Sequence, residues 1–494
     1  MNLKIENAPI MELNADLLVL NMFEGTTVPG GATGSVNEDL DGVISKFIIK
    51  KEGFSGKFGS TYILPLPNCK QYTKLLLVGL GKREDFSINK LRELSSLIVQ
   101  KIKNIFNVKT VVSMLHGAGC AGFEPYDCGK AIAEGLMIGG YDFACYKSSK
   151  QKGIKEFKIA ECDLKKYQEA KEGFERGLLI GDTINFARDL VNEPAEKVTP
   201  EYLANLASEL NLDEVKIYEK IDIVNMQMGA FAAVGQGSVN PPKFIHMEYK
   251  PSKAKKKVVL IGKGITFDAG GLNLKPASSM STMKNDMSGA AVVLSIMRNI
   301  KKLKPDVEVH GLIAACENMP SGSSYKQGDI LTAMNGKTIE VDNTDAEGRL
   351  TLADALCYAQ QLNPDVIIDI ATLTGACVTA LGKVASAVLG NNDELIKKLI
   401  ACGNKGGEKL WRMPFYQEYA SSIKSDIADM KNCGNGKGGT TVAALFLSNF
   451  VNPKTPWGHI DIAGTAVIDE AVCEMPKGAT GVGTRTLINY LFSE

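Results

Sequence analysis

Short apolar segments alternate with amphipathic helical patterns along the whole chain, and this alternation limits the possible fold most strongly. Apolar segments of strand length lie at 16–23, 73–81 and 108–117 in the first part of the chain, with helical patterns at 87–106 and 129–137. In the second part, 256–262 forms an apolar segment that leads into a glycine-rich turn, and 307–316 forms another. Buried strands that alternate with helices are typical of α/β proteins with a largely parallel, helix-covered sheet. We therefore predict an α/β fold.

The length of the chain predicts two domains. Its 494 residues, of which 45% are hydrophobic, exceed the roughly 250–300 residues at which a single core stops growing. A charged passage poor in apolar residues lies at 147–168, and a long helical pattern begins near its end. We expect a first domain at 1–164 and a second at 165–494, with 165–190 as the connecting helix.

The net charge and the distribution of cysteines limit which classes of partner and which cellular compartment we expect. Lys+Arg and Asp+Glu both number 56, and no basic block is large enough to bind nucleic acid or a membrane surface. The eleven cysteines are scattered without a CxxC pair, which favours a reduced protein. The N-terminus lacks the charge and hydropathy pattern of a signal peptide, and no apolar run reaches about 18 residues. We expect a cytoplasmic protein with no membrane partner, and the balanced charge argues against a nucleic-acid partner.

An unusually charged stretch, VDNTDAEGRL at 341–350, lies between a predicted strand and a predicted helix. Asp345 and Glu347 are two residues apart, so in an extended segment their side chains point to the same face. Two close carboxylates raise each other's pKa unless a positive group lies between them, and the candidates are a metal ion and Arg349. In open α/β sheets, ligands bind at the carboxyl ends of the strands, where this stretch is predicted to lie.

A second polar cluster lies about eighty residues upstream. Lys263 follows a predicted strand, and Asp268 stands beside the Gly270–Gly271 pair, which allows a tight turn. Asp286 precedes the next predicted helix. Four carboxylates at one sheet edge imply polyvalent cations, and two metal ions about 3.5–4 Å apart could clamp both a nucleophile and an oxyanion.

Each part of this pattern also has a simpler interpretation. Asp345 could only cap the helix, and Glu347 could be a first-turn acid that the helix dipole favours. Lys263 and Lys275 could be surface lysines. The glycine-rich segment around Asp268 matches neither GxGxxG nor GxxxxGK[ST], which argues against phosphate binding. The histidines, at 116, 246, 310 and 459, show no HExxH or other ligand spacing, so we expect structural roles for them.

The combination of segments resembles the leucyl (cytosol) aminopeptidase family of dinuclear metallo-exopeptidases. NTDAEGRL at 343–350 matches the family signature letter for letter. Further segments match in order and spacing: GKGITFDAGGLNLKP at 262–276, MKNDMSGAA at 283–291, ENMPSG at 317–322, ATLTGA at 371–376 and HIDIAG at 459–464. The resemblance covers the chain from about 165 onward. It implies a C-terminal α/β catalytic domain with a mixed, largely parallel central sheet, preceded by a divergent macro-like α/β domain.

The resemblance also implies the metal ligands Lys263, Asp268, Asp286, Asp345 and Glu347, with Asp268 and Glu347 bridging two ions. One ion is expected on Asp268, Asp345 and Glu347, and the other on Lys263, Asp268, Asp286 and Glu347. Lysine ligates only as the neutral amine, so a dication must depress its pKa. Oxygen ligands with one amine suit Zn²⁺ or Mn²⁺, with Co²⁺ or Mg²⁺ as alternatives in one site.

Catalytic roles follow from the same resemblance. A metal-bridging water is expected to attack the first peptide bond, and binding of the free α-amine restricts attack to that bond. Lys275 is expected to polarise the scissile carbonyl and stabilise the oxyanion. Arg349 cannot act as a base, because a guanidinium does not deprotonate in proteins, and in this family it holds a bicarbonate ion that does.

Substrate preference and assembly rest on the resemblance alone. The family implies release of N-terminal leucine and other bulky apolar residues, with Met283, Thr372 and Gly375 as walls of the side-chain pocket. Residues 1–164 are expected to help assembly into a hexamer. Two other functions stay open at this point: a two-metal phosphoesterase, and a DNA-binding regulatory hexamer without catalysis.

Overall fold

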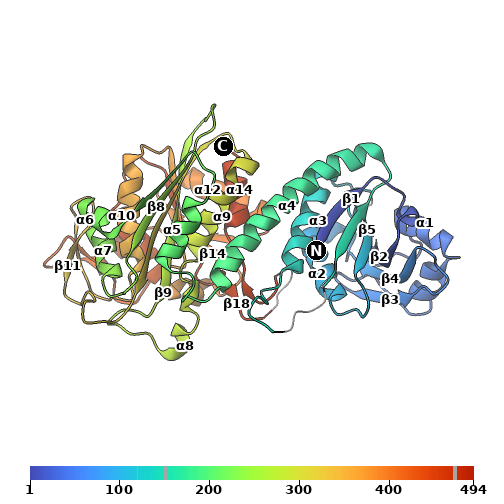
Figure 1. The fold of residues 1–494 in the computed structure, drawn as a ribbon, viewed down its shortest axis with the longest axis horizontal. Coiled ribbons are helices and arrows are strands. Elements are labelled where there is room, and N and C mark those ends of the chain that lie inside the picture. Colours follow the sequence, from blue (N-terminus) through green and yellow to red (C-terminus); the bar gives the residue numbers. More distant parts are fainter. Residues whose placement is uncertain (120, 149–152, 471–474) are drawn as a thin grey trace. The chain divides into compact units, whose positions relative to one another are not determined.

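The computed structural model describes residues 1–119, 121–148, 153–470 and 475–494, which form two compact units (Figure 1). Unit 1 consists chiefly of Met1–Asp182, and unit 2 of Thr183–Asp469 with Lys477–Glu494. The long helix α4 (Leu164–Asn192) contains the division between them. Both units are α/β, which confirms the predicted fold class. The predicted boundary at 164/165 falls at the start of α4 and stays a prediction.

Unit 1 is built on a six-stranded sheet with the order β1-β6-β5-β2-β4-β3, in which only the β3–β4 pair is antiparallel among the described strands. Successive residues of β2 belong to different apolar clusters. Leu17 and Val19 pack with α2 and α3, whereas Leu18 and Leu20 pack on the opposite side. The sheet is therefore covered on both faces, as the unbroken apolar strands predict. The strands are β1 Asn2–Glu6, β2 Ala15–Met22, β3 Thr61–Pro65, β4 Tyr72–Gly79, β5 Thr110–Met114 and β6 Glu156–Ala160, and the helices are α1 Gly31–Asp39, α2 Ile88–Ile102 and α3 Pro125–Gly140.

Unit 2 is built on an eight-stranded sheet with the order β15-β14-β17-β13-β9-β10-β8-β7. Its centre is parallel, from β17 through β13 and β9 to β10, whereas β8, β7 and the β14–β17 pair add antiparallel neighbours. The sheet is thus mixed and largely parallel, as predicted. Its strands are β7 Glu214–Tyr218, β8 Lys243–Tyr249, β9 Lys257–Asp268, β10 Glu308–Asn318, β13 Val366–Ala371, β14 Ser386–Gly390, β15 Leu410–Arg412 and β17 Trp457–Asp461.

Helices and two small sheets surround this central sheet. The helices are α5 Pro200–Ser208, α6 Lys220–Asn225, α7 Gly229–Gly235, α8 Ala277–Met280, α9 Ser288–Leu303, α10 Gly348–Gln361, α11 Gly375–Leu381, α12 Asp393–Gly406, α13 Gly439–Ser448 and α14 Thr484–Leu491. One small sheet contains β11 Ile330–Thr332, β12 Thr338–Glu340 and β16 Met430–Lys431, and the other contains β18 Val467–Ile468 and β19 Gly478–Ala479. None of the helices in the described part of the chain combines the length and hydropathy needed to span a bilayer.

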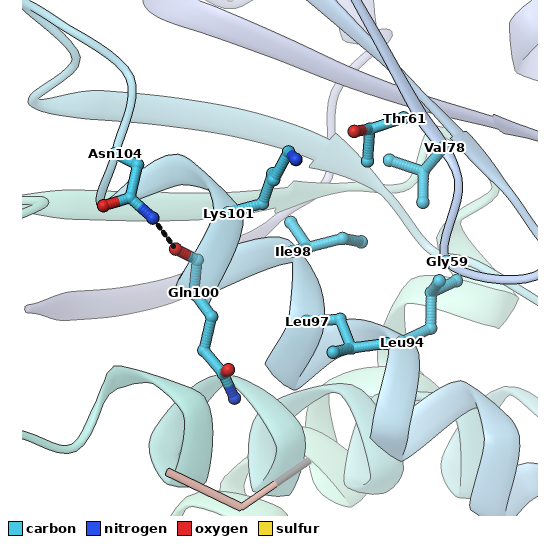
Figure 2. Close-up of a pocket in the computed structure, with 9 residues that line it drawn as sticks. All are labelled: Gly59, Thr61, Val78, Leu94, Leu97, Ile98, Gln100, Lys101 and Asn104. Atoms are coloured by element: carbon cyan, nitrogen blue, oxygen red, sulfur yellow. Dashed lines mark hydrogen bonds between the residues drawn. The ribbon is translucent and has the colours of Figure 1, made fainter. Parts of the chain in front are cut away.

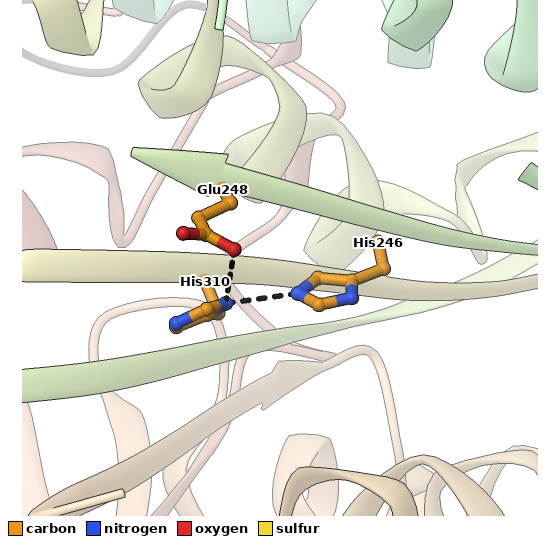
Figure 3. A group of neighbouring side chains, drawn as sticks. All are labelled: His246, Glu248 and His310. Atoms are coloured by element: carbon orange, nitrogen blue, oxygen red, sulfur yellow. Dashed lines mark hydrogen bonds and ion pairs between the residues drawn. The ribbon is translucent and has the colours of Figure 1, made fainter. Parts of the chain in front are cut away.

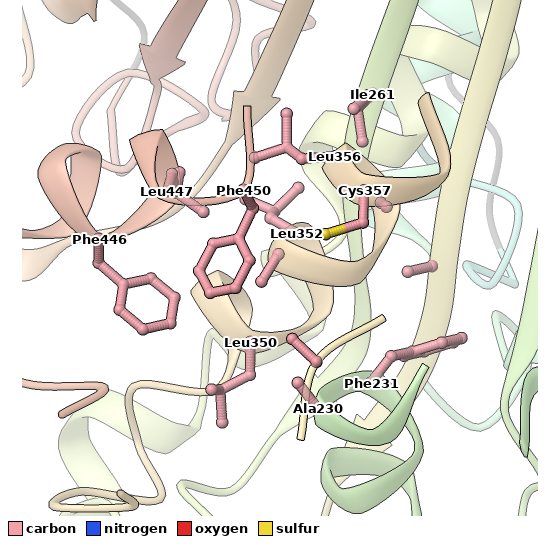
Figure 4. Packing of buried hydrophobic residues seen from close by; sticks show 14 of the residues in the cluster. Ala230, Phe231, Ile261, Leu350, Leu352, Leu356, Cys357, Phe446, Leu447 and Phe450 are labelled. Atoms are coloured by element: carbon pink, nitrogen blue, oxygen red, sulfur yellow. The ribbon is translucent and has the colours of Figure 1, made fainter. Parts of the chain in front are cut away.

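Helix α10 anchors the core on one face of the central sheet. Its buried Leu350, Leu352 and Leu356 pack in one cluster with Phe231 of α7 and Ile261 of β9 (Figure 4). Residues of β9 with odd numbers up to 265 face this cluster, because strand side chains alternate. The N-terminus of α10, directly after the charged stretch, is therefore held beside the carboxyl ends of the central strands.

Helix α9 packs on the face of β9 opposite to α10, and its backbone lies very close to the strands. A Cβ atom built on Gly289 would lie 2.0 Å from the carbonyl oxygen of Ile370 and 2.9 Å from the amide nitrogen of Lys263. The helix thus packs with its backbone directly on the strands. This packing places Asp286, just before α9, at the same end of the sheet.

One predicted strand end is wrong. The strand expected at 256–262 continues to Asp268, because the glycine-rich segment after it is extended and pairs with β10. A Cβ built on Gly262 would lie 2.5 Å from the carbonyl oxygen of Gly289. The glycine at this position therefore serves close packing between strand and helix and forms no turn.

Candidate metal centre

A cavity of about 420 Å³ lies in unit 2, where the central strands end. Nine of the ten residues that the sequence singled out line it: Lys263, Asp268, Lys275, Met283, Asp286, Asp345, Glu347, Thr372 and Gly375. They come from segments up to 112 positions apart, and the fold brings them to one place. The tenth, Arg349, is not among the lining residues and is described below.

A β-bulge in β9 aligns the first two of these residues. The register between β9 and β10 shifts at Cys316 and Glu317, which leaves Thr266 of β9 as an extra residue. Lys263 and Asp268 are five positions apart, so a regular strand would direct them to opposite faces. The extra residue reverses the alternation, and both side chains point to the α10 face.

Lys263 is 3% exposed and lies between two carboxylates. Its Nζ is 2.7 Å from Asp286 Oδ2 and 2.9 Å from Glu347 Oε1, and it also donates to the carbonyl oxygen of Thr372 at 3.0 Å. Burial alone would lower the pKa of Lys263, but the charges of Asp286 and Glu347 raise it above its usual value. The absence of a side chain at Gly348 leaves room for this lysine, since a Cβ there would lie 2.4 Å from its Cε.

Lys275 lies between the other two acids of the centre. Its Nζ is 2.8 Å from Asp268 Oδ2 and 2.6 Å from Asp345 Oδ1. The turn that returns the chain from β9 to Lys275 needs Gly270, whose φ is +89° and whose Cβ would lie 2.4 Å from a backbone oxygen. The two lysines thus lie in the same cavity but pair with different carboxylates.

The four carboxylates in the cavity carry more negative charge than the two lysines paired with them can neutralise. Burial and the charge of Glu347 raise the pKa of Asp268 to about 6, and burial raises that of Asp286 well above its usual range. Burial also raises the pKa of Asp345, whereas Lys263 and Lys275 outweigh burial at Glu347 and lower its pKa. The ionised form of such carboxylates is destabilised, and additional positive charge would stabilise it.

The bonding of the carboxylate oxygens fits a cation. Oxygen atoms of Asp268, Asp286 and Glu347 approach within 4.8 Å of one another, as in a shared metal site. Among the described residues, Asp286 Oδ2 and Asp345 Oδ1 are buried and accept no well-directed hydrogen bond, although a lysine ammonium is near each. Buried oxygens of this kind need a partner, and a divalent cation would supply one.

Arg349 does not line the cavity. It is 8% exposed, and its Nη1 donates to the carbonyl oxygen of Asn432 at 2.9 Å. Burial lowers its pKa. In the described part of the chain, its Nε has no hydrogen-bond partner, and neither does Nε2 of the buried His459. A free, buried guanidinium donor of this kind can bind a small anion or a water molecule.

Two residues support the acids of the centre in a way that the sequence did not predict. Asn318, at the end of β10, donates through Nδ2 to Asp268 Oδ1 at 2.8 Å and to the carbonyl oxygen of Thr344. Thr372 was expected in the substrate pocket, and its Oγ1 also donates to Asp286 Oδ1 at 2.7 Å. Both fix the orientation of acids in the centre. Asn318 lies within the ENMPSG segment, which was the available signal.

A second pocket, of about 250 Å³, lies in unit 1 between α2 and the β3–β4 side of the sheet (Figure 2). Its lining consists of Gly59, Thr61, Val78, Leu94, Leu97, Ile98, Gln100, Lys101 and Asn104. Lys101 is the one ionisable group among these residues, and no acid or nucleophile accompanies it. The lining therefore offers no arrangement for catalysis, in contrast to the cavity of unit 2.

Family models match both parts of the chain. The model of the cytosol aminopeptidase family, catalytic domain, matches residues 185–488. The model of the N-terminal domain of the same family matches residues 19–150. All residues of the candidate metal centre lie within the first of these matches.

Relatives match over nearly the whole length. A probable cytosol aminopeptidase of Persephonella marina is 41% identical over 502 residues and covers 100% of both chains. A probable cytosol aminopeptidase of Aquifex aeolicus is 44% identical over 90% of each chain. Among solved structures, a mutant of tomato leucine aminopeptidase has a TM-score of 0.89 and 34% identity, covering 100% of this chain and 97% of the other. The bottromycin maturation enzyme BotP in complex with Mn has a TM-score of 0.86 and 32% identity, covering 97% and 99%.

Proposed function

The chain belongs to the cytosol aminopeptidase family and is a metal-dependent aminopeptidase, and we propose that it releases leucine and other bulky apolar residues from the N-terminus of peptides. One observation carries the proposal. One cavity at the carboxyl ends of the central strands is lined by Lys263, Asp268, Asp286, Asp345 and Glu347. Two of the buried carboxylate oxygens of these residues accept no well-directed hydrogen bond. This donor set suits two divalent ions.

We assign these five residues as the ligands that would hold the two ions. Zn²⁺ or Mn²⁺ suits the donors, with Co²⁺ or Mg²⁺ as alternatives in one position, and BotP, a structural relative, was solved in complex with Mn. When bound, the two ions would supply an acidified water as the nucleophile and a site for the free α-amine of the peptide. Lys263 must lose its proton to ligate, so metal competes with the proton that its carboxylate neighbours now stabilise.

Lys275 keeps its charge in this proposal. Burial alone would lower its pKa, but Asp268 and Glu347 raise it, so the group is a cation at neutral pH. It lines the cavity beside Asp345, from where its ammonium can polarise the scissile carbonyl and stabilise the negative charge that develops on the oxygen.

Arg349 would hold a small anion behind the metal centre. Its Nε is buried without a partner, and the group stays charged because guanidinium does not deprotonate in proteins. Bicarbonate, an anion whose oxygens accept hydrogen bonds, would suit this donor and would supply a proton acceptor.

The cavity wall supports a preference for apolar side chains. Met283, Thr372 and Gly375 line it together with Leu373 and Val378. Gly375 has no atom within 4 Å of a built Cβ, so the wall is open there and leaves room for a bulky side chain. The name of the relatives, cytosol aminopeptidase, supports a cytoplasmic location.

The test is hydrolysis of an L-leucyl anilide beside its N-acetylated analogue. We expect cleavage of the free-amine substrate alone, its loss after chelation, and its return with Mn²⁺ or Zn²⁺. Faster cleavage of alanyl or glutamyl anilides than of the leucyl compound would overturn the substrate preference. Cleavage of the acetylated analogue at a similar rate would overturn the role of the α-amine.

A further inference from the structure

Two histidines and a glutamate converge far from the cavity, on the α10 face of the same sheet (Figure 3). His246 and Glu248 are alternate residues of β8, and His310 of β10 is paired with Glu248 in the register. His246 Nε2 lies 2.8 Å from His310 Nδ1, which lies 4.0 Å from Glu248 Oε2. The three ligand atoms all lie within 4.8 Å of one another.

From this geometry, we propose that His246, His310 and Glu248 bind a divalent transition-metal ion, Zn²⁺ by preference, at a site separate from the proposed catalytic centre. Two imidazoles and a carboxylate, with a fourth position left for water, are a donor set that zinc favours. Metal–ligand distances of about 2.0–2.2 Å place tetrahedral ligand atoms about 3.3 Å apart. The histidine nitrogens, now 2.8 Å apart, need to separate by about half an ångström, and the carboxylate oxygen, now 4.0 Å from His310 Nδ1, needs to approach by about 0.7 Å to meet these values.

The other nitrogen of each ring is already held, as metal-binding histidines require. His310 Nε2 donates to Glu308 Oε1 at 2.9 Å, and Glu308 is itself paired with Lys257 at 3.0 Å. His246 Nδ1 lies 3.1 Å from the hydroxyl of Tyr358 on α10. A carboxylate behind one ring and a hydroxyl behind the other fix both rings with Nε2 of His246 and Nδ1 of His310 facing each other.

The hydrogen bonds accommodate the ion without a net change of protons. Without metal, the Tyr358 hydroxyl donates to His246 Nδ1, and His246 Nε2 donates to His310 Nδ1. With metal, the proton of His246 resides on Nδ1 and donates to Tyr358, whose hydroxyl then turns to Tyr218, 3.0 Å away. His310 keeps its proton on Nε2, toward Glu308, in both arrangements.

Charge also favours a cation here. Lys216 pairs with Glu214 at 2.7 Å, and Lys257 pairs with Glu308. Among the described residues, Glu248 forms no ion pair with a lysine or arginine, and Lys216, whose charge also acts on Glu248, is itself paired with Glu214. The side chain of Glu248 is 19% exposed and those of both histidines 4% or less, which leaves an entry path at the glutamate.

The site lies toward the amino ends of β9 and β10. His310 is opposite Val259 of β9, so Lys263 is four residues, or about 13 Å, further along the strand. An ion at this position would link β8 to β10 next to the edge strand β7 and would not contact a peptide in the cavity. The inference therefore does not depend on the proposed peptidase function.

The test measures Zn²⁺ bound per chain after chelation and equilibrium dialysis of the full-length protein, by elemental analysis. We expect Glu248→Gln and His310→Gln to bind one equivalent less than the wild type, whatever the number held in the catalytic cavity. Glu248→Gln keeps the histidine–histidine hydrogen bond, so its fold should be intact. Glu418→Gln is the control, an acid-to-amide change at an exposed residue outside the cluster, and it should bind as the wild type does.

Two further readouts separate a ligand from a structural residue. Co²⁺ at this site should give visible bands of a tetrahedral ion that disappear in His310→Gln. Glu308→Gln should weaken Zn²⁺ binding by about 10–100-fold at this site while the ion is still bound at high concentration. Equal Zn²⁺ content in the wild type, Glu248→Gln and His310→Gln would overturn the proposal and leave a metal-free chain of hydrogen bonds.

Discussion

At the scale of single residues, the two lysines of the cavity have similar sequence surroundings and different structural ones. Lys263 is wedged between Asp286 and Glu347 behind Gly348, where it has little freedom to move. Lys275 follows a glycine turn and borders the open part of the cavity. A ligand must be fixed among acids, whereas a group that stabilises an oxyanion must reach the substrate. The structure thus supports different tasks for the two lysines.

Replacement of Lys275 by alanine should therefore lower kcat by about 10²–10³-fold and leave the metal content unchanged, because the side chain acts on the transition state. Asp286→Ala should lose metal instead. Steady-state kinetics with elemental analysis of each variant measures both effects. Lys383→Ala is the control, since Lys383 also lines the cavity but is half exposed and paired with Asp469. Metal loss in Lys275→Ala equal to that in Asp286→Ala would contradict this division.

At the scale of elements, the sequence predicted the strands and helices well and their detailed geometry poorly. The apolar runs and the motifs were enough to identify the acids and lysines that gather in the cavity. Alternation alone, however, directs Lys263 and Asp268 to opposite faces, and only the bulge at Thr266 brings them together. His246 and His310 are 64 positions apart, and no spacing rule could connect them before the β8–β10 register was known.

The close packing of α9 on β9 gives a prediction at this scale. Gly289→Ala should destabilise unit 2 by about 1–3 kcal/mol or more, because the new methyl group would collide with backbone atoms that cannot move aside. Urea unfolding followed by circular dichroism measures this loss. Gly322→Ala is the control, since a Cβ there has no neighbour within 4 Å. Unchanged stability of Gly289→Ala would mean that α9 can shift along the sheet.

At the scale of the whole molecule, the relatives match both units, and the residues that line the candidate metal centre all belong to unit 2. We propose that this unit, including the predicted domain 1–164, serves assembly into a hexamer. The candidate metal centre is lined by residues of unit 2 alone, which leaves unit 1 available for contacts between chains.

Light scattering of the purified protein tests this proposal. We expect a mass about six times that of the 53.2 kDa chain, and peptidase activity that elutes with this species on size exclusion. As a control, the same sample is diluted until the assembly dissociates, and the activity of the dissociated chains is measured. A fully active monomer would refute the assembly role of unit 1.

The bulge in β9 has a consequence for how related chains should be compared. Thr266 contributes the length of one residue to the strand, and its side chain is not what brings Asp268 to the cavity. Thr266 is buried and its Oγ1 donates to the carbonyl oxygen of Cys316 at 3.4 Å, so a replacement of similar volume, such as Thr266→Val, should keep the geometry of the centre. Loss or gain of one residue between Lys263 and Asp268 would instead turn the acid toward α9. The spacing of these two residues is therefore the property to compare, and we expect a chain that is one residue longer or shorter between them to lack this candidate metal centre.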